Sequence, residues 1–80
     1  MGYGVIKFRI GPVGEYDDAW YLEKRWETGG GYKMIAYLKK GRVVKLLILD
    51  KRPPQILVDR DARKKLRRIL PTEFHELSRV

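Results

Sequence analysis

Residues 32–49, YKMIAYLKKGRVVKLLIL, are the stretch that decides the fold of this chain. Two runs rich in aliphatic, aromatic and β-branched residues, 32–39 and 42–49, are separated by Lys40 and Gly41. A short connection that contains glycine, which takes positive φ readily, is typical of a tight β-hairpin turn. Successive side chains of a strand point to opposite faces of a sheet, so Lys33, Ile35, Tyr37 and Lys39 share a face opposite an apolar one.

The segment before this hairpin contains two further runs with strand character. Residues 3–10 (YGVIKFRI) and 19–28 (AWYLEKRWET) alternate and are rich in aromatic residues. Glycine-rich breaks at 11–14 and 29–31 separate the runs. We therefore expect four consecutive antiparallel strands.

After the hairpin the pattern becomes helical. Pro53 and Pro54 cannot donate to a strand ladder, and residues 55–58 are interpreted as a short extended segment. Asp59 is expected to cap a helix that runs to about Leu70 and is stopped by Pro71. The apolar stripe of that helix is Ala62, Leu66, Ile69 and Leu70. The expected fold is α+β: a four-stranded antiparallel curved sheet followed by one amphipathic helix and a short terminal helix (ββββα).

Length and composition limit the possible classes of protein. The 80 residues make one domain, 1–80, and the absence of cysteine excludes disulfides and thiolate metal sites. The longest apolar run, residues 46–49, is too short for a membrane span, and no basic-then-apolar signal pattern opens the chain. We expect a cytoplasmic, nucleoid-associated protein without membrane contact. The lack of Asn, with many charged residues, is typical of thermophilic proteins.

The positive charge is concentrated in one part of the sequence. The formal net charge is +8, and residues 39–68 hold twelve basic and three acidic side chains, while residues 1–38 are balanced. Such a local excess attracts polyanions over about one Debye length, roughly 8–10 Å at ordinary salt. The alternative is a solvated charged surface that only maintains solubility.

Aromatic and basic residues are interleaved on the expected strands. Trp20, Lys24 and Trp26 share one face of residues 19–28, and Tyr37 lies between lysines on residues 32–39. Rings stack on unpaired bases, and cations contact phosphates. The alternative for the two tryptophans is a place in the core under the helix. The candidate nucleic-acid-binding residues are Trp20, Lys24, Trp26, Lys33, Tyr37, Lys39, Lys40, Arg42 and Lys45.

Signals for catalysis or cofactor binding are weak. His75 is the only histidine, so paired histidine metal ligands are impossible. The glycines at 2–4 and 29–31 lack the remaining residues of nucleotide-binding loops. We therefore expect a non-enzymatic protein without cofactor or metal, with a small ribonuclease as a remote alternative.

Residues 56–66, ILVDRDARKKL, resemble the C-terminal half of the positive-cofactor-four family of transcription-coactivator-like proteins. In that family a short strand leads into a capped amphipathic helix, a pattern that Ile56, Val58, Asp59 and Leu66 match. Arg63 stands where the family usually has an aromatic residue. The resemblance implies a homodimer built through the helices and a curved sheet that holds single-stranded DNA.

Together, these patterns predict a nucleic-acid-binding protein that prefers single-stranded DNA or RNA and has little sequence specificity. Two alternatives remain open at this point. One is a backbone binder of duplex DNA or structured RNA that uses the basic helix. The other is an interaction module for an acidic protein partner.

Overall fold

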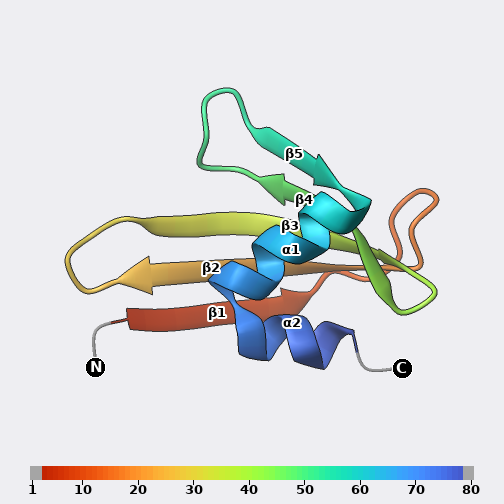
Figure 1. Ribbon diagram of the computed structural model, residues 1–80, viewed down its shortest axis with the longest axis horizontal. Helices are drawn as coiled ribbons and strands as arrows, with labels where there is room; N and C mark the ends of the chain where they lie inside the picture. Colours follow the sequence, from red (N-terminus) through yellow and green to blue (C-terminus); the bar gives the residue numbers. More distant parts are fainter. Residues whose placement is uncertain (1–2, 79–80) are drawn as a thin grey trace.

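The computed structural model describes residues 3–78 and has an α+β fold with one antiparallel sheet (Figure 1). The sheet is a five-stranded meander in the order β1-β2-β3-β4-β5, and two helices follow it. The elements are β1 (Tyr3–Arg9), β2 (Asp18–Trp26), β3 (Gly31–Lys39), β4 (Arg42–Ile48), β5 (Gln55–Val58), α1 (Asp59–Ile69) and α2 (Pro71–Leu77). The fold class is therefore as expected, but the expected number of four strands is wrong.

The additional strand is β5, which sequence analysis treated as an extended segment. Its residues, QILV, pair antiparallel with β4, with Leu57 opposite Leu46 and Gln55 opposite Ile48. Two prolines precede β5, and it is only four residues long, so its alternation is too short to be recognised. Its aliphatic residues nevertheless suit the open edge of β4.

A register shift in the β3–β4 pair decides which side chains of β4 face the core. Tyr37 lies opposite Lys45, but Leu38 lies opposite Val43, so Val44 is an additional residue on β4. Without this β-bulge, Val43 and Lys45 would share a face, because they are two residues apart. The bulge allows Val43 to be buried in the core while Lys45 points to the other side.

The core lies between the sheet and α1. The expected stripe of Ala62, Leu66, Ile69 and Leu70 is buried, as the sequence predicts, and packs on Leu22, Met34, Ala36, Leu38, Val43, Leu46 and Ile48. Two hydrogen bonds add polar links between the layers: Lys24 Nζ donates to the Ile69 carbonyl at 2.9 Å and Arg63 to the Val43 carbonyl at 2.8 Å. We call the side of the sheet under α1 the helix face.

The helix boundaries differ in detail from the expectation. Asp59 is the first residue of α1 rather than its cap, with φ of 50°, and the preceding Val58 makes no side-chain cap hydrogen bond. Pro71 does separate the helices, but as the first residue of α2. A proline suits this position because the first helical N–H has no partner within the helix. Neither α1 nor α2 is long and apolar enough to cross a membrane.

Replacing Leu66 with alanine should strongly destabilise the protein. Leu66 is fully buried between α1 and the sheet, and removing a buried leucine typically costs about 2–5 kcal/mol. The exposed Lys64 on the same helix provides the control, since Lys64→Ala should change the free energy of unfolding by less than about 0.5 kcal/mol. Urea unfolding of both variants measures the difference, and similar small effects would contradict this account of the core.

Candidate nucleic-acid interface

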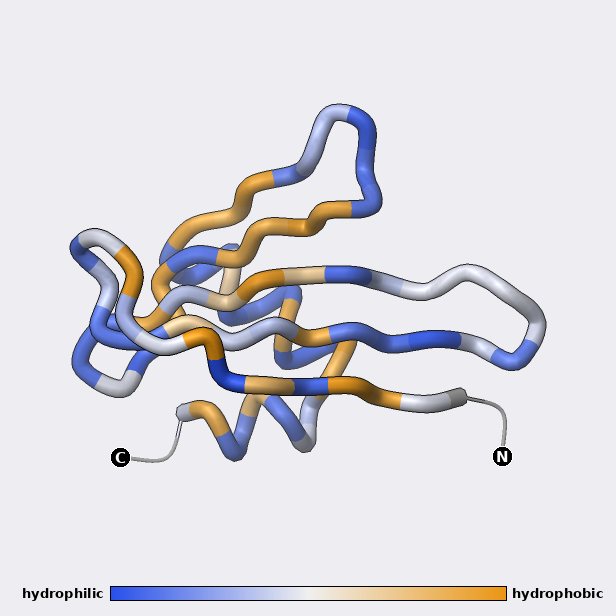
Figure 2. Tube along the Cα trace, turned by 180° about the vertical axis from the view of Figure 1, so that it is seen from behind, coloured by the Kyte–Doolittle hydropathy of each residue, from blue (hydrophilic) through white to orange (hydrophobic). Residues whose placement is uncertain are grey.

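The side of the sheet opposite α1, which we call the open face, is not covered by any described helix (Figures 1 and 2). The strand register determines which side chains it carries. They are Ile6, Phe8, Ala19, Tyr21, Glu23, Arg25, Lys33, Ile35, Tyr37, Lys39, Arg42, Lys45, Leu47, Ile56 and Val58. This face therefore combines apolar, aromatic and basic side chains.

Large apolar side chains of the open face come from β1, β3, β4 and β5. Phe8 is 53% exposed and Ile6 is 43% exposed on β1, while Ile56 is 57% exposed on β5. Ile35 and Leu47 lie opposite one another between these edges. This apolar band is thus exposed at both edges and half-buried in the middle, and exposed apolar side chains gathered on one face of a folded domain are a common sign of a binding surface.

Two aromatic pairs lie on this band. Phe8 and Tyr21 come from paired positions of β1 and β2, and their rings are stacked with centroids 5.0 Å apart. Tyr37 on β3 contacts Tyr16 from the β1–β2 connection, with centroids 4.9 Å apart. Lys45 Nζ lies 5.1 Å from the Tyr37 ring and 5.8 Å from the Tyr16 ring. A cation at this distance is attracted to the ring face, so the second pair combines stacking surfaces with a positive charge.

Cations gather where β3 turns into β4. Lys39 and Arg42 are a cross-strand pair at the end of the open face, and Lys40 occupies the turn between them. Asp17 accepts the backbone N–H of Lys40 at 2.6 Å, and Glu15 lies 3.8 Å from Lys39 Nζ. The turn is thus fixed to the β1–β2 connection, while its side chains are exposed to solvent.

Glu23 is a buried acid on the open face, with only 5% of its surface exposed. Its carboxylate accepts a hydrogen bond from the Tyr21 hydroxyl at 2.6 Å and another from Arg25 Nε. The Tyr21 hydroxyl and then the Arg25 guanidinium hold the pKa of Glu23 below its ordinary value. Glu23 therefore orients one ring and one cation of the open face.

The structure divides the nine candidate residues between two sides of the molecule. Lys33, Tyr37, Lys39, Arg42 and Lys45 share the open face, and Lys40 adjoins it in the turn. Trp20, Lys24 and Trp26 lie on the helix face. The nine candidate residues therefore do not form one uncovered surface.

The three helix-face residues have contacts of their own. Trp20 packs against the core, and its indole N–H donates to Asp18 at 3.2 Å. Lys24 bonds the end of α1. Trp26 is 40% exposed and contacts Tyr32 edge-on, with centroids 5.6 Å apart. Of these three, Trp26 retains a ring surface that a base can reach.

Sequence analysis did not identify three rings of the interface: Phe8, Tyr16 and Tyr21. The alternation of β1 could have placed Phe8. Val5 packs against the core, so Ile6 and Phe8, which point to the other face of the same strand, belong to the open face. Tyr16 lies between strands, and alternation cannot place it. It is positioned by a bridge between Val13 and Tyr16 within the β1–β2 connection.

Comparisons with known proteins give no match: no protein-family model, no curated protein and no solved structure. Within residues 3–78 there is no group of three or more His, Asp or Glu side chains placed to hold a metal ion. Functional inference therefore depends on the residues and geometry described above.

The buried Glu23 should make the stability of the protein sensitive to acid. Its folded-state pKa lies below the ordinary value of 4.5, so the carboxylate stabilises the folded state above that pH. This contribution is lost as the pH falls through the lowered folded value. Urea unfolding at a series of pH values should show a steeper acid loss for the wild type than for Glu23→Gln, and parallel curves would contradict this role.

Proposed function

We propose that the protein binds single-stranded nucleic acid, DNA or RNA, on its open face, with little sequence specificity and without catalysis. The observation that carries the proposal is the presence of exposed rings and cations on one uncovered sheet surface. Phe8 and Tyr21 offer one stacking platform, and Tyr37 with Tyr16 offers a second. Stacking on an aromatic side chain contributes about 1–3 kcal/mol per base and tolerates any base.

The cations of the open face provide the phosphate contacts in this proposal. Lys45 lies beside the Tyr37 ring, and Lys39 and Arg42 lie farther along the same hairpin. A nucleic-acid strand whose base stacks on Tyr37 thus meets Lys45 beside that base and two further cations along the hairpin. This arrangement suits a polyphosphate better than an acidic protein surface, which has no planar groups at regular intervals.

A specific feature also favours the alternative of a duplex or structured-RNA backbone binder. The solvent-facing side of α1 is basic; its exposed cations are Arg60, Lys64, Arg67 and Arg68. These side chains can contact phosphates without any ring. Since bases in a duplex are already stacked, rings are not needed for that mode of binding.

The similarity to the positive-cofactor-four family and the homodimer that it implies stay predictions. A homodimer formed through the helices would leave the open face of each subunit accessible. The proposed binding mode therefore does not require the dimer, and it does not conflict with it.

Replacing Phe8 with alanine should weaken binding of a single-stranded oligonucleotide by about 5- to 100-fold, because one stacking platform is lost. Duplex binding should change much less. Trp26→Ala is the matched control, since it removes an exposed ring from the helix face, and it should have little effect. Fluorescence anisotropy with a labelled oligonucleotide measures both variants. A large effect of Trp26→Ala with none of Phe8→Ala would place the strand on the helix face instead.

Binding should weaken steeply as salt increases, because phosphate contacts release counterions. Lys45→Gln should remove one phosphate contact and so reduce the magnitude of the slope of log affinity against log salt by about 1. Lys64→Gln on α1 should leave the slope for single strands unchanged. If Lys64→Gln alone reduces it, the helix is the phosphate-binding element, and the backbone-binder alternative is supported.

A further inference from the structure

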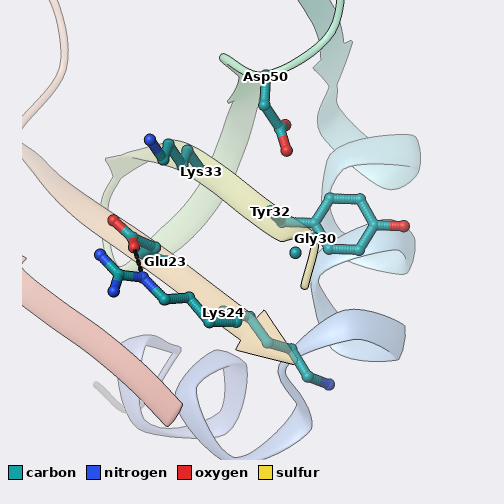
Figure 3. Close-up of a pocket in the computed structure, with 8 residues that line it drawn as sticks. Glu23, Lys24, Gly30, Tyr32, Lys33 and Asp50 are labelled. Carbon is teal, nitrogen blue, oxygen red and sulfur yellow. Dashed lines mark hydrogen bonds and ion pairs between the residues drawn. The ribbon is translucent and has the colours of Figure 1, made fainter. Parts of the chain in front are cut away.

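A pocket of about 300 Å³ lies where β2 and β3 meet the turn after β4 (Figure 3). Its lining includes Arg25, Gly31, Lys33 and Asp50 as well as the buried Glu23. The volume is at the lower end of the range of small-molecule sites. Glu23, Arg25 and Lys33 belong to the open face, and Lys24 and Tyr32, which also line the pocket, belong to the helix face, so the pocket lies where the two faces meet.

Gly31, which belongs to the lining of this pocket, lies very close to the backbone of β2. Gly31 lies opposite Arg25 in the β2–β3 pair and has φ of 146°. A Cβ added at this position would lie 1.9 Å from the Lys24 carbonyl oxygen, which is far inside van der Waals contact. Only glycine fits there, because the backbone of Lys24 and Arg25 already occupies the place of a side chain.

Arg25 is a positioned donor at the wall of this pocket. Its Nε donates to Glu23, and Glu23 is in turn fixed by the Tyr21 hydroxyl. Figure 3 marks a hydrogen bond that Glu23 accepts with a dashed line. A guanidinium has five N–H donors, so its two terminal nitrogens keep four donors for a ligand. Lys33, opposite Glu23 in the register, adds a further cation.

Asp50 provides a hydrogen-bond acceptor on the side of β3 away from Glu23. In Figure 3, Asp50 and Glu23 lie on opposite sides of the strand that carries Lys33. The Leu49 N–H donates to the Lys33 carbonyl at 2.7 Å, which keeps the start of this turn against β3. The Asp50 carboxylate makes no hydrogen bond or ion pair with any other residue between 3 and 78. It is therefore available to a ligand.

We propose that this pocket binds a guanine base of a single strand that lies on the open face. The inference rests on the proposed function and adds a base preference to it. Guanine has two adjacent donors, N1–H and the N2 amino group, that match the two oxygens of Asp50. Its O6 and N7 are acceptors that a guanidinium recognises with two hydrogen bonds, as Arg25 does here with support from Lys33.

Other ligands fit the same groups less well. A phosphate would be attracted to the cations of the lining, Lys24, Arg25 and Lys33, but repelled by the carboxylates of Asp50 and Glu23, and it has no donors for Asp50. Thymine and uracil have a single ring donor, and adenine has no acceptor at position 6. A neutral base with paired donors on one edge and paired acceptors on the next matches both sides of the pocket.

The experiment compares an oligothymidylate of about 12 nucleotides with the same strand carrying one central guanine, by fluorescence anisotropy at one salt concentration. The wild type should bind the guanine-containing strand about tenfold more tightly. Hypoxanthine, which lacks the N2 amino group, should lose most of this preference at the same position. Equal affinity for the three strands would overturn the guanine pocket and leave the proposed function intact, whereas no binding of any strand would overturn both.

Two variants assign the preference to the pocket. Asp50→Asn should reduce the ratio of the two affinities to near one, because an amide cannot accept both guanine donors. Asp61→Asn makes the same change of charge on α1, outside the pocket, and should keep the tenfold ratio. If the ratio survives in Asp50→Asn, or is lost equally in both variants, Asp50 does not read the base.

Discussion

Burial of the apolar stripe of α1 on one face of the sheet is the constraint on which the rest of the structure depends. A chain of 80 residues has one helix long enough to cover a sheet, and Leu66 and Ala62 place it over the middle strands. No described helix is then left to cover the open face. Its side chains, among them Ile6, Phe8 and Ile56, stay in water. Burying the core on one side thus creates the apolar surface on the other.

The bulge in β4 connects this constraint to the interface. Val43 is needed in the core, where it packs near α1, and Lys45 is needed outside, where it lies over Tyr37 and Tyr16. A regular strand cannot satisfy both, because residues two apart share a face. The additional residue, Val44, lets Val43 join Leu46 and Ile48 in the core while Lys45 stays on the open face.

Alternation and helical spacing predicted much of this arrangement. The faces of β3, the position of the hairpin turn and the buried stripe of α1 all follow from local patterns, which depend only on nearest neighbours in the chain. The fifth strand and the bulge do not, because each is defined by pairing with another strand. The division of the candidate residues between the two faces of the sheet also depends on how the strands pair. Lys33 and Lys24 look equivalent in sequence, but one strand register puts them on opposite sides.

The distribution of rings, rather than of charge, separates the two modes of nucleic-acid binding. The basic residues of 39–68 occur on both sides of the molecule, at Lys39, Arg42 and Lys45 on the open face and along α1 on the other. Charge alone therefore attracts any nucleic acid to either side. Stacking, by contrast, needs unpaired bases and accessible rings, and the pairs Phe8–Tyr21 and Tyr16–Tyr37 belong to the open face. Because a duplex gains nothing from these rings, the binding mode that we propose for the open face prefers a single strand even where the overall electrostatic attraction is the same.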